Sequence, residues 1–262
     1  MEPLFDNPIA VTAIVVLIAA VLLGRALRRR QRAAQVEELA TDQGWTSVDQ
    51  PREFADLVAG AVPELAQQAS SQARRASHRS TATSGSRNVP VSKGTGRSSS
   101  KARNVYLADV GAGSVAIGDV QISAGTGSLP ARQGSVRRGA VAATLAEPVP
   151  TLQLTSRATV ELGRDDDLPD GLASAFRAEQ IDADARAHYL DSGAWTPLVG
   201  DRVDLDQVTV DGDRLVLVAA EELTPERAEA LVAVAERFAA EVVPQVDADH
   251  DRPLVTSPLA ST

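Results

Sequence analysis

Histidine and cysteine, the residues that most often hold metals or act as nucleophiles, are scarce in this chain. It has no cysteine and three histidines, His78, His188 and His250. Without thiolates the chain can form neither a disulfide nor a cysteine-ligated zinc site. No two histidines have the i, i+4 spacing that brings two metal ligands to one face of a helix. His188 precedes Tyr189, and we expect it to pack or to lie at the surface.

Aspartates gather in four short stretches, and grouped carboxylates are the ligands that hard cations such as Ca²⁺ prefer. None of the stretches has the spacing of an EF-hand loop, with its central glycine and closing glutamate. We interpret them as solvated loops and turns rather than as cation sites. The stretches are Asp165, Asp166, Asp167 and Asp170; Asp204 and Asp206; Asp211 and Asp213; and Asp247, Asp249 and Asp251.

Glycine-rich segments form no nucleotide-binding motif here. No Gly-x-Gly-x-x-Gly opens a helix after a strand, and neither Gly-Lys-Ser nor Gly-Lys-Thr occurs. We interpret "GAGSVAIG" (111–118) and "SAGTGS" (123–128) as hairpin turns. A Gly-x-Ser-x-Gly nucleophile elbow is also missing from the sequence. We therefore predict no catalytic, cofactor-binding or metal-binding residue, and we expect the protein not to be an enzyme.

A long apolar segment lies near the N-terminus. From Pro8 to Gly24 there is no charged residue, and Thr12 carries the single hydroxyl. Extended to Leu27, the segment has about 20 residues, which as a helix is enough to cross a hydrocarbon core. We predict a transmembrane helix over residues 8–27, and a buried core helix is the alternative.

The flanks of this segment indicate its orientation. A cleaved signal peptide would need basic residues before the apolar run and a small-x-small site after it, whereas Glu2 and Asp6 precede the run. Five arginines follow it, and the positive-inside rule places such a cluster in the cytoplasm. We predict a single-pass protein of the bacterial inner membrane, with residues 1–7 outside and the C-terminal domain in the cytoplasm. The membrane-orienting residues are Arg25, Arg28, Arg29, Arg30 and Arg32.

The segment 69–103 is rich in serine, threonine, glycine and arginine and nearly free of large apolar residues. It cannot bury enough surface to offset its ordering entropy, so we predict a disordered basic linker. Its arginines, among them Arg74, Arg75 and Arg79, could contact anionic lipid headgroups of the inner leaflet. A solvated spacer is one alternative. Contact with the domain that follows is another, because residues 109–262 carry 12 basic and 26 acidic residues. Aromatic residues for base stacking are missing, which argues against sequence-specific binding of nucleic acid.

Within the linker, "RRASHRS" resembles a basophilic kinase site, with Ser77 as the candidate phosphosite. A phosphate there would remove part of the positive charge and weaken attraction to the leaflet.

We expect an α+β fold, in which the transmembrane helix precedes a mostly antiparallel sheet packed with helices. The clearest local pattern is "QVTVDGDRLVLVAAE", two alternating apolar runs around Asp211-Gly212, which predicts a type I′ hairpin. The runs 104–110 and 114–123 predict another hairpin, and 139–147 and 151–157 a second strand-like pair around "PVP". Thr224 is a suitable N-cap for an amphipathic C-terminal helix whose apolar face is Ala228, Leu231, Ala235, Phe238 and Val242.

Shorter elements and the boundaries complete the prediction. We expect a short strand at "WTSVD" (45–49), a loop and a short helix in "DDDLPDGLASAF" (165–176), a strand at "AEQI" (178–181) and a helix near 182–193. The segments of the chain are then an N-terminus outside the membrane (1–7), the transmembrane helix (8–27), a juxtamembrane helical segment (28–68), the linker (69–103), the cytoplasmic domain (104–246) and a disordered tail (247–262).

Several short stretches, taken in order, resemble an uncharacterised family of single-pass membrane-anchored proteins of high-GC bacteria. They are "LATDQGWTSV", "ARNVYLADVGAGSVAIGDVQI", "AVAATLAEPVPTLQL", "FRAEQIDADARAHYL" and "EVVPQV". The resemblance implies a membrane-tethered cytoplasmic domain of unknown role, and it supplies no site residues.

We expect the domain to be an interaction or scaffold module with a protein partner that the sequence does not identify. A small-ligand sensor is one alternative, and an enzyme whose site is built from scattered carboxylates is another.

Overall fold

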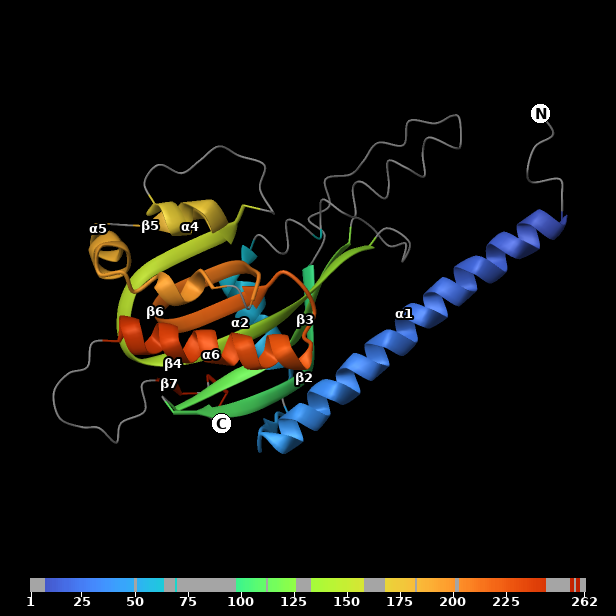
Figure 1. Ribbon diagram of the computed structural model, residues 1–262, viewed down its shortest axis with the longest axis horizontal. Coiled ribbons are helices and arrows are strands. Elements are labelled where there is room, and N and C mark those ends of the chain that lie inside the picture. Colours follow the sequence, from blue (N-terminus) through green and yellow to red (C-terminus); the bar gives the residue numbers. More distant parts are fainter. Residues whose placement is uncertain are drawn as a thin grey trace, which may run out of the picture.

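In the computed structural model, the fold is α+β, with a mostly antiparallel sheet and helices on both of its faces (Figure 1). The structure describes residues 8–49, 51–63, 69, 98–111, 113–125, 133–157, 168–181, 183–200, 203–243, 255–256 and 258–259. The helices are α1 (Pro8–Asp42), α2 (Pro51–Ala61), α4 (Asp170–Ala175), α5 (Ala183–Ala185) and α6 (Pro225–Val242). The strands are β1 (Thr46–Ser47), β2 (Ser98–Val110), β3 (Gly113–Gly125), β4 (Gln133–Ser156), β5 (Phe176–Ile181), β6 (Leu205–Ala219) and β7 (Val255–Thr256).

Helix α1 joins the N-terminal apolar run to the domain without a break (Figure 1). Its C-terminal half packs on the domain through Val36 and Ala40, which are one turn apart and buried. The helix ends at Asp42, and two residues later Gly44 has a φ of 71°, the left-handed conformation typical of a helix stop. The N-terminal helix is therefore present as expected. Among the described residues, none of the helices combines the length and the apolar character that a membrane crossing requires.

The middle of the sheet is buried on both faces, which explains the long apolar runs of β4 and β6. Successive residues of a strand point to opposite faces, so Val115 and Ile117 belong to one hydrophobic cluster and Ala116 to the other. Helix α6 and the end of α1 cover the first face. Helix α2 covers the second with Phe54 and Val58. Figure 1 shows α6 in front of the sheet and α2 behind it.

The expected hairpin of β2 and β3 is confirmed, with Val110 opposite Gly113. Helix α6 is also confirmed: Thr224 Oγ1 accepts a hydrogen bond from Arg227 N, 3.3 Å away, and the expected apolar face is buried. Strands β1 and β5 and helix α4 lie where the sequence predicted them, and α2 lies within the segment 28–68 that was predicted to be helical. The expected helix near 182–193 consists of α5 followed by a π-helical turn, Arg186–Asp191.

The hairpin predicted at Asp211-Gly212 is wrong. Residues 205–219 form one strand, β6, and both of its halves pair with β4. A type I′ turn needs positive φ at both central residues, and of the two only Gly212 has one, 60°. Gly212 lies opposite Val149, where the β4–β6 register shifts. The glycine therefore bends a continuous strand instead of reversing it.

The strand-like pair predicted around "PVP" is also a single strand. Strand β4 continues through Pro148 and Pro150, which flank the register shift at Val149. Proline cannot donate a ladder hydrogen bond, and an irregular register tolerates that loss. Strand β4 thus stays unbroken and curves with β6.

Two segments predicted to be disordered contain strand residues. Residues 98–103 of the predicted linker open β2 and pair with Asp119–Ala124 of β3 through the backbone, which does not require large side chains. In the predicted tail, Val255 and Thr256 form β7 against β3 and β4. The rest of the linker after residue 69 and most of the tail lie outside the described residues.

The domain begins earlier than the predicted residue 104. Val36 and Ala40 of α1 belong to the first cluster, Phe54 and Val58 of α2 to the second, and β1 pairs with β2. In the sequence, parts of the domain therefore come both before and after the segment between α2 and β2.

Replacing Gly212 and Asp211 by valine tests the bent strand. We expect Gly212→Val to lower the free energy of unfolding by roughly 1–2 kcal/mol, because valine is strained at positive φ. Asp211→Val should change it by less than about 0.5 kcal/mol, since Asp211 is exposed in a strand. Urea unfolding followed by circular dichroism measures both. If residues 211 and 212 formed a type I′ turn instead, both replacements would lower the free energy of unfolding.

Candidate functional site

A cavity of about 200 Å³ lies where the middle of α1 meets the sheet and the β6–α6 connection. We call it the basic cleft. Its walls come from α1, β2, β3, the start of β4 and the residues just before α6. The lining residues are Arg29, Arg30, Arg32, Ala33, Lys101, Arg103, Asn104, Asp119, Val120, Gln121, Arg137, Glu222 and Leu223.

Strand register places the sheet side of the cleft. Lys101 pairs with Gln121, and Gln121 with Arg137, which makes one row across β2, β3 and β4. Arg103 pairs with Asp119 two residues along, in a second row. Residues two apart on a strand share a face, so both rows lie on the face that α1 covers.

Gly139 completes the second row and allows the β6–α6 connection to approach. It pairs with Asp119, and its N–H donates to Glu221 O at 2.8 Å. A Cβ on this residue would lie 2.5 Å from Leu223 Cδ2. The missing side chain therefore lets Leu223 and Glu222 form one wall of the cleft.

The β2 wall is irregular beside Arg103. The β2–β3 register shifts between Arg103 and Tyr106, and Asn104 has a φ of 51°. Asparagine tolerates this left-handed conformation better than most residues do. A bulge re-aims side chains and often adjoins a functional site.

Asp119 is the most perturbed carboxylate of the cleft. Its Oδ1 accepts a hydrogen bond from Leu223 N at 2.8 Å. Burial raises the pKa of Asp119 from 3.8 to about 6, and nearby Glu222 adds to the rise. The Leu223 N–H, Arg137 and Arg227 act in the opposite direction. The carboxyl group therefore titrates well above the usual pH range of an aspartate.

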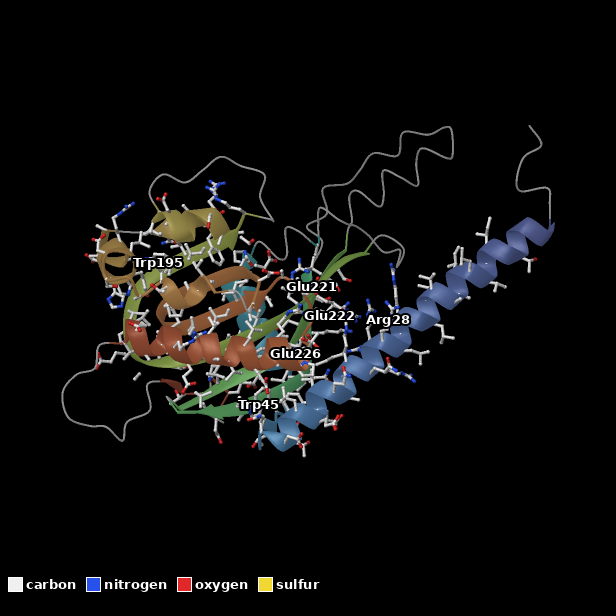
Figure 2. The ribbon with its side chains drawn as sticks, in the orientation of Figure 1. Arg28, Trp45, Trp195, Glu221, Glu222 and Glu226 are labelled. Carbon is white, nitrogen blue, oxygen red and sulfur yellow. The ribbon has the colours of Figure 1, made fainter. Side chains whose placement is uncertain are left out.

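Weak ion pairs connect α1 to the domain. Glu222 Oε1 lies 3.8 Å from Arg29 Nε and 3.9 Å from Arg137 Nη1. Figure 2 shows Arg28 on α1 on the side that faces Glu221 and Glu222. The Arg29 side chain is 52% exposed, so solvent screens its pair and the contribution to stability is small.

Three of the five arginines that were predicted to orient the helix in a membrane lie at the cleft. Arg29, Arg30 and Arg32 line it, whereas Arg25 and Arg28 do not. Lys101, Arg103, Arg137, Asp119 and Glu222 were not singled out from the sequence. Lys101 and Arg103 alternate as strand residues do, but their surroundings indicated a linker.

The other candidate residues lie elsewhere. His188 Nε2 is 2.8 Å from Val242 O at the end of α6, and its ring meets that of Tyr189 edge-on. Asp206 is buried and pairs with Arg138 at 3.1 Å. In the described part of the chain, histidines and carboxylates form no group of three that could hold a metal. The candidates outside the described residues are Ser77, Arg74, Arg75, Arg79, His78, His250, Asp165, Asp166, Asp167, Asp247, Asp249 and Asp251.

No family model, curated protein or solved structure matches the chain. The resemblance to a membrane-anchored bacterial family therefore stays a prediction.

Titrating Asp119 tests the environment of the cleft. Because its pKa is raised in the folded state to about 6, folded protein binds this proton more tightly than unfolded protein does. The contribution of Asp119 to stability should therefore decrease as the pH rises from about 4 through 6. Asp119→Asn keeps an acceptor for Leu223 N–H and removes the titration.

We expect the stability of Asp119→Asn, relative to that of the original chain, to increase between pH 4 and pH 7. Urea unfolding at several pH values measures this difference. A difference that does not change with pH would contradict the raised pKa.

Proposed function

We propose that this protein is a single-pass protein of the bacterial cell membrane that holds a binding domain directly against the cytoplasmic surface. The main support is the distribution of apolar surface. Among the described residues, the large hydrophobic side chains that are exposed all lie on α1, between Ile14 and Leu27, and are 46–65% exposed. This part of α1 extends beyond the domain (Figure 1). A lipid environment would remove that surface from water.

The length and the flanks of the apolar run support the same proposal. In the sequence the run begins at Pro8, ahead of Ile14, from which on the side chains of the helix are described without a gap. From Pro8 to Leu27 there are about 20 residues, the length that a spanning helix needs. The arginines that follow favour an N-terminus outside the cell.

The continuity of α1 supports a domain held close to the surface. The helix continues from Leu27 to Val36, which is buried in the domain core. At 1.5 Å per residue this distance is about 14 Å. The domain is therefore held by a helix, and we propose that it acts by binding a partner at the membrane rather than by catalysis.

Cysteine labelling tests the topology, because the chain has no cysteine of its own. We expect Asp6→Cys to react with a membrane-impermeant maleimide on intact spheroplasts. Glu241→Cys, at an exposed position of α6, should react only after the membrane is permeabilised. The unsubstituted chain is the control for background labelling.

Sodium carbonate extraction of membranes from the same cells complements the labelling. A spanning protein stays in the pellet. Release of the chain into the supernatant, or labelling of Glu241→Cys on intact spheroplasts, would overturn the proposed function.

A further inference from the structure

The basic cleft holds more positive than negative charge. Six of its lining side chains are basic and two are acidic. Both acidic side chains are already engaged, Asp119 by Leu223 N–H and Glu222 by two arginines. The other basic side chains have no carboxylate within ion-pair distance in the described part of the chain. They are Arg30, Arg32, Lys101 and Arg103.

We propose that the basic cleft binds a phosphate group, and that in the cell this phosphate belongs to the headgroup of an anionic phospholipid. The assignment of the phosphate to a lipid rests on the proposed function, in which α1 spans the membrane. The proposal that the cleft binds phosphate does not depend on it, because it follows from the side chains of the cleft alone.

These four side chains match phosphate in charge and in the hydrogen bonds that they can donate. Three of the four are arginines, whose planar guanidinium groups donate paired hydrogen bonds to phosphate oxygens. The lysine adds a compact charge. They come from two elements, α1 and β2, that face each other across the cavity. Like charges held this close repel one another, and a bound anion relieves that repulsion.

The size of the cleft limits what it can hold. Its volume of about 200 Å³ lies below the range of pockets for drug-sized ligands, roughly 300–1,000 Å³. Its lining residues include no aromatic side chain on which a base could stack. A phosphate with a small substituent fits such a site better than a nucleotide or a nucleic acid strand does.

The position of the cleft along α1 favours a lipid as the source. Arg29, Arg30 and Arg32 follow the last residue of the apolar run, Leu27, by two to five residues. At 1.5 Å per residue these arginines lie within about 8 Å of the end of the run. In a membrane-spanning α1 that is the depth of the headgroups, where phospholipid phosphates are found.

Binding can be measured on the full chain in a neutral detergent at constant ionic strength. One arm adds phosphatidylglycerol to the micelles, with zwitterionic phosphatidylcholine as the comparison lipid. The other arm adds glycerol 3-phosphate, a soluble phosphoester. The thermal unfolding midpoint, recorded over a concentration series, gives the apparent affinity.

The variant Lys101→Gln/Arg103→Gln removes two charges from the β2 wall. We expect it to weaken binding by about tenfold or more, because a charge-assisted hydrogen bond to phosphate is stronger than a hydrogen bond between neutral groups. The matched control is Arg52→Gln/Arg237→Gln, which removes two exposed charges of α2 and α6 outside the cleft. Its affinity should stay unchanged. If the β2 variant does not fold, Arg30→Gln/Arg32→Gln replaces it, since both arginines line the cleft and both side chains are exposed.

Stronger binding of phosphatidylglycerol than of phosphatidylcholine, lost in the cleft variant only, supports the proposal with a lipid source. Variant-sensitive binding of glycerol 3-phosphate alone supports the site with a soluble source, and it would stand even if the topology test failed. No binding in either arm, or equal loss in the cleft and control variants, would overturn the proposal.

Discussion

Strand β4 pairs with β3, β5, β6 and β7 along its 24 residues, and the layers of the domain depend on this pairing. Its residues 140–142 lie between β3 and β6, and its residues 152–155 lie between β5 and β6. The register shift at Val149 lets β4 and β6 curve together, so that one ribbon carries both hydrophobic clusters.

The same sheet positions the basic cleft. Strand β4 contributes Arg137, and its pairing with β3 aligns the rows that carry Lys101 and Arg103. Gly139 admits the β6–α6 connection, which brings Glu222 to α1. The buried side chains of Val36 and Ala40 pack α1 on the domain near the cleft. The proposed anchor and the proposed phosphate site thus belong to one unit, since the helix that carries the apolar run also supplies one wall of the cleft.

Much of the fold followed from local patterns. Helix α6 was predictable because its cap, its apolar period and its proline at the first position all agree. The Asp211-Gly212 hairpin was wrong because a short-range turn pattern competes with pairing to a distant strand, and β4 offered partners to both halves of β6. The site was largely missed for a related reason. Lys101 and Arg103 stand in a polar stretch, and their role depends on backbone pairing with β3, which side-chain pattern does not reveal.

The sequence by itself determined the charge asymmetry, the apolar run with its arginines, the lack of thiol chemistry and the amphipathic face of α6, because each depends on residues near one another in the chain. Only the tertiary structure decided that α1 packs on the domain, that two predicted strand pairs are single bent strands, and that cations from α1, β2 and β4 converge. Those features arise from contacts between residues far apart in the chain, such as Arg29 and Glu222. The energy of such contacts depends on which backbone groups and apolar faces meet once the chain is folded.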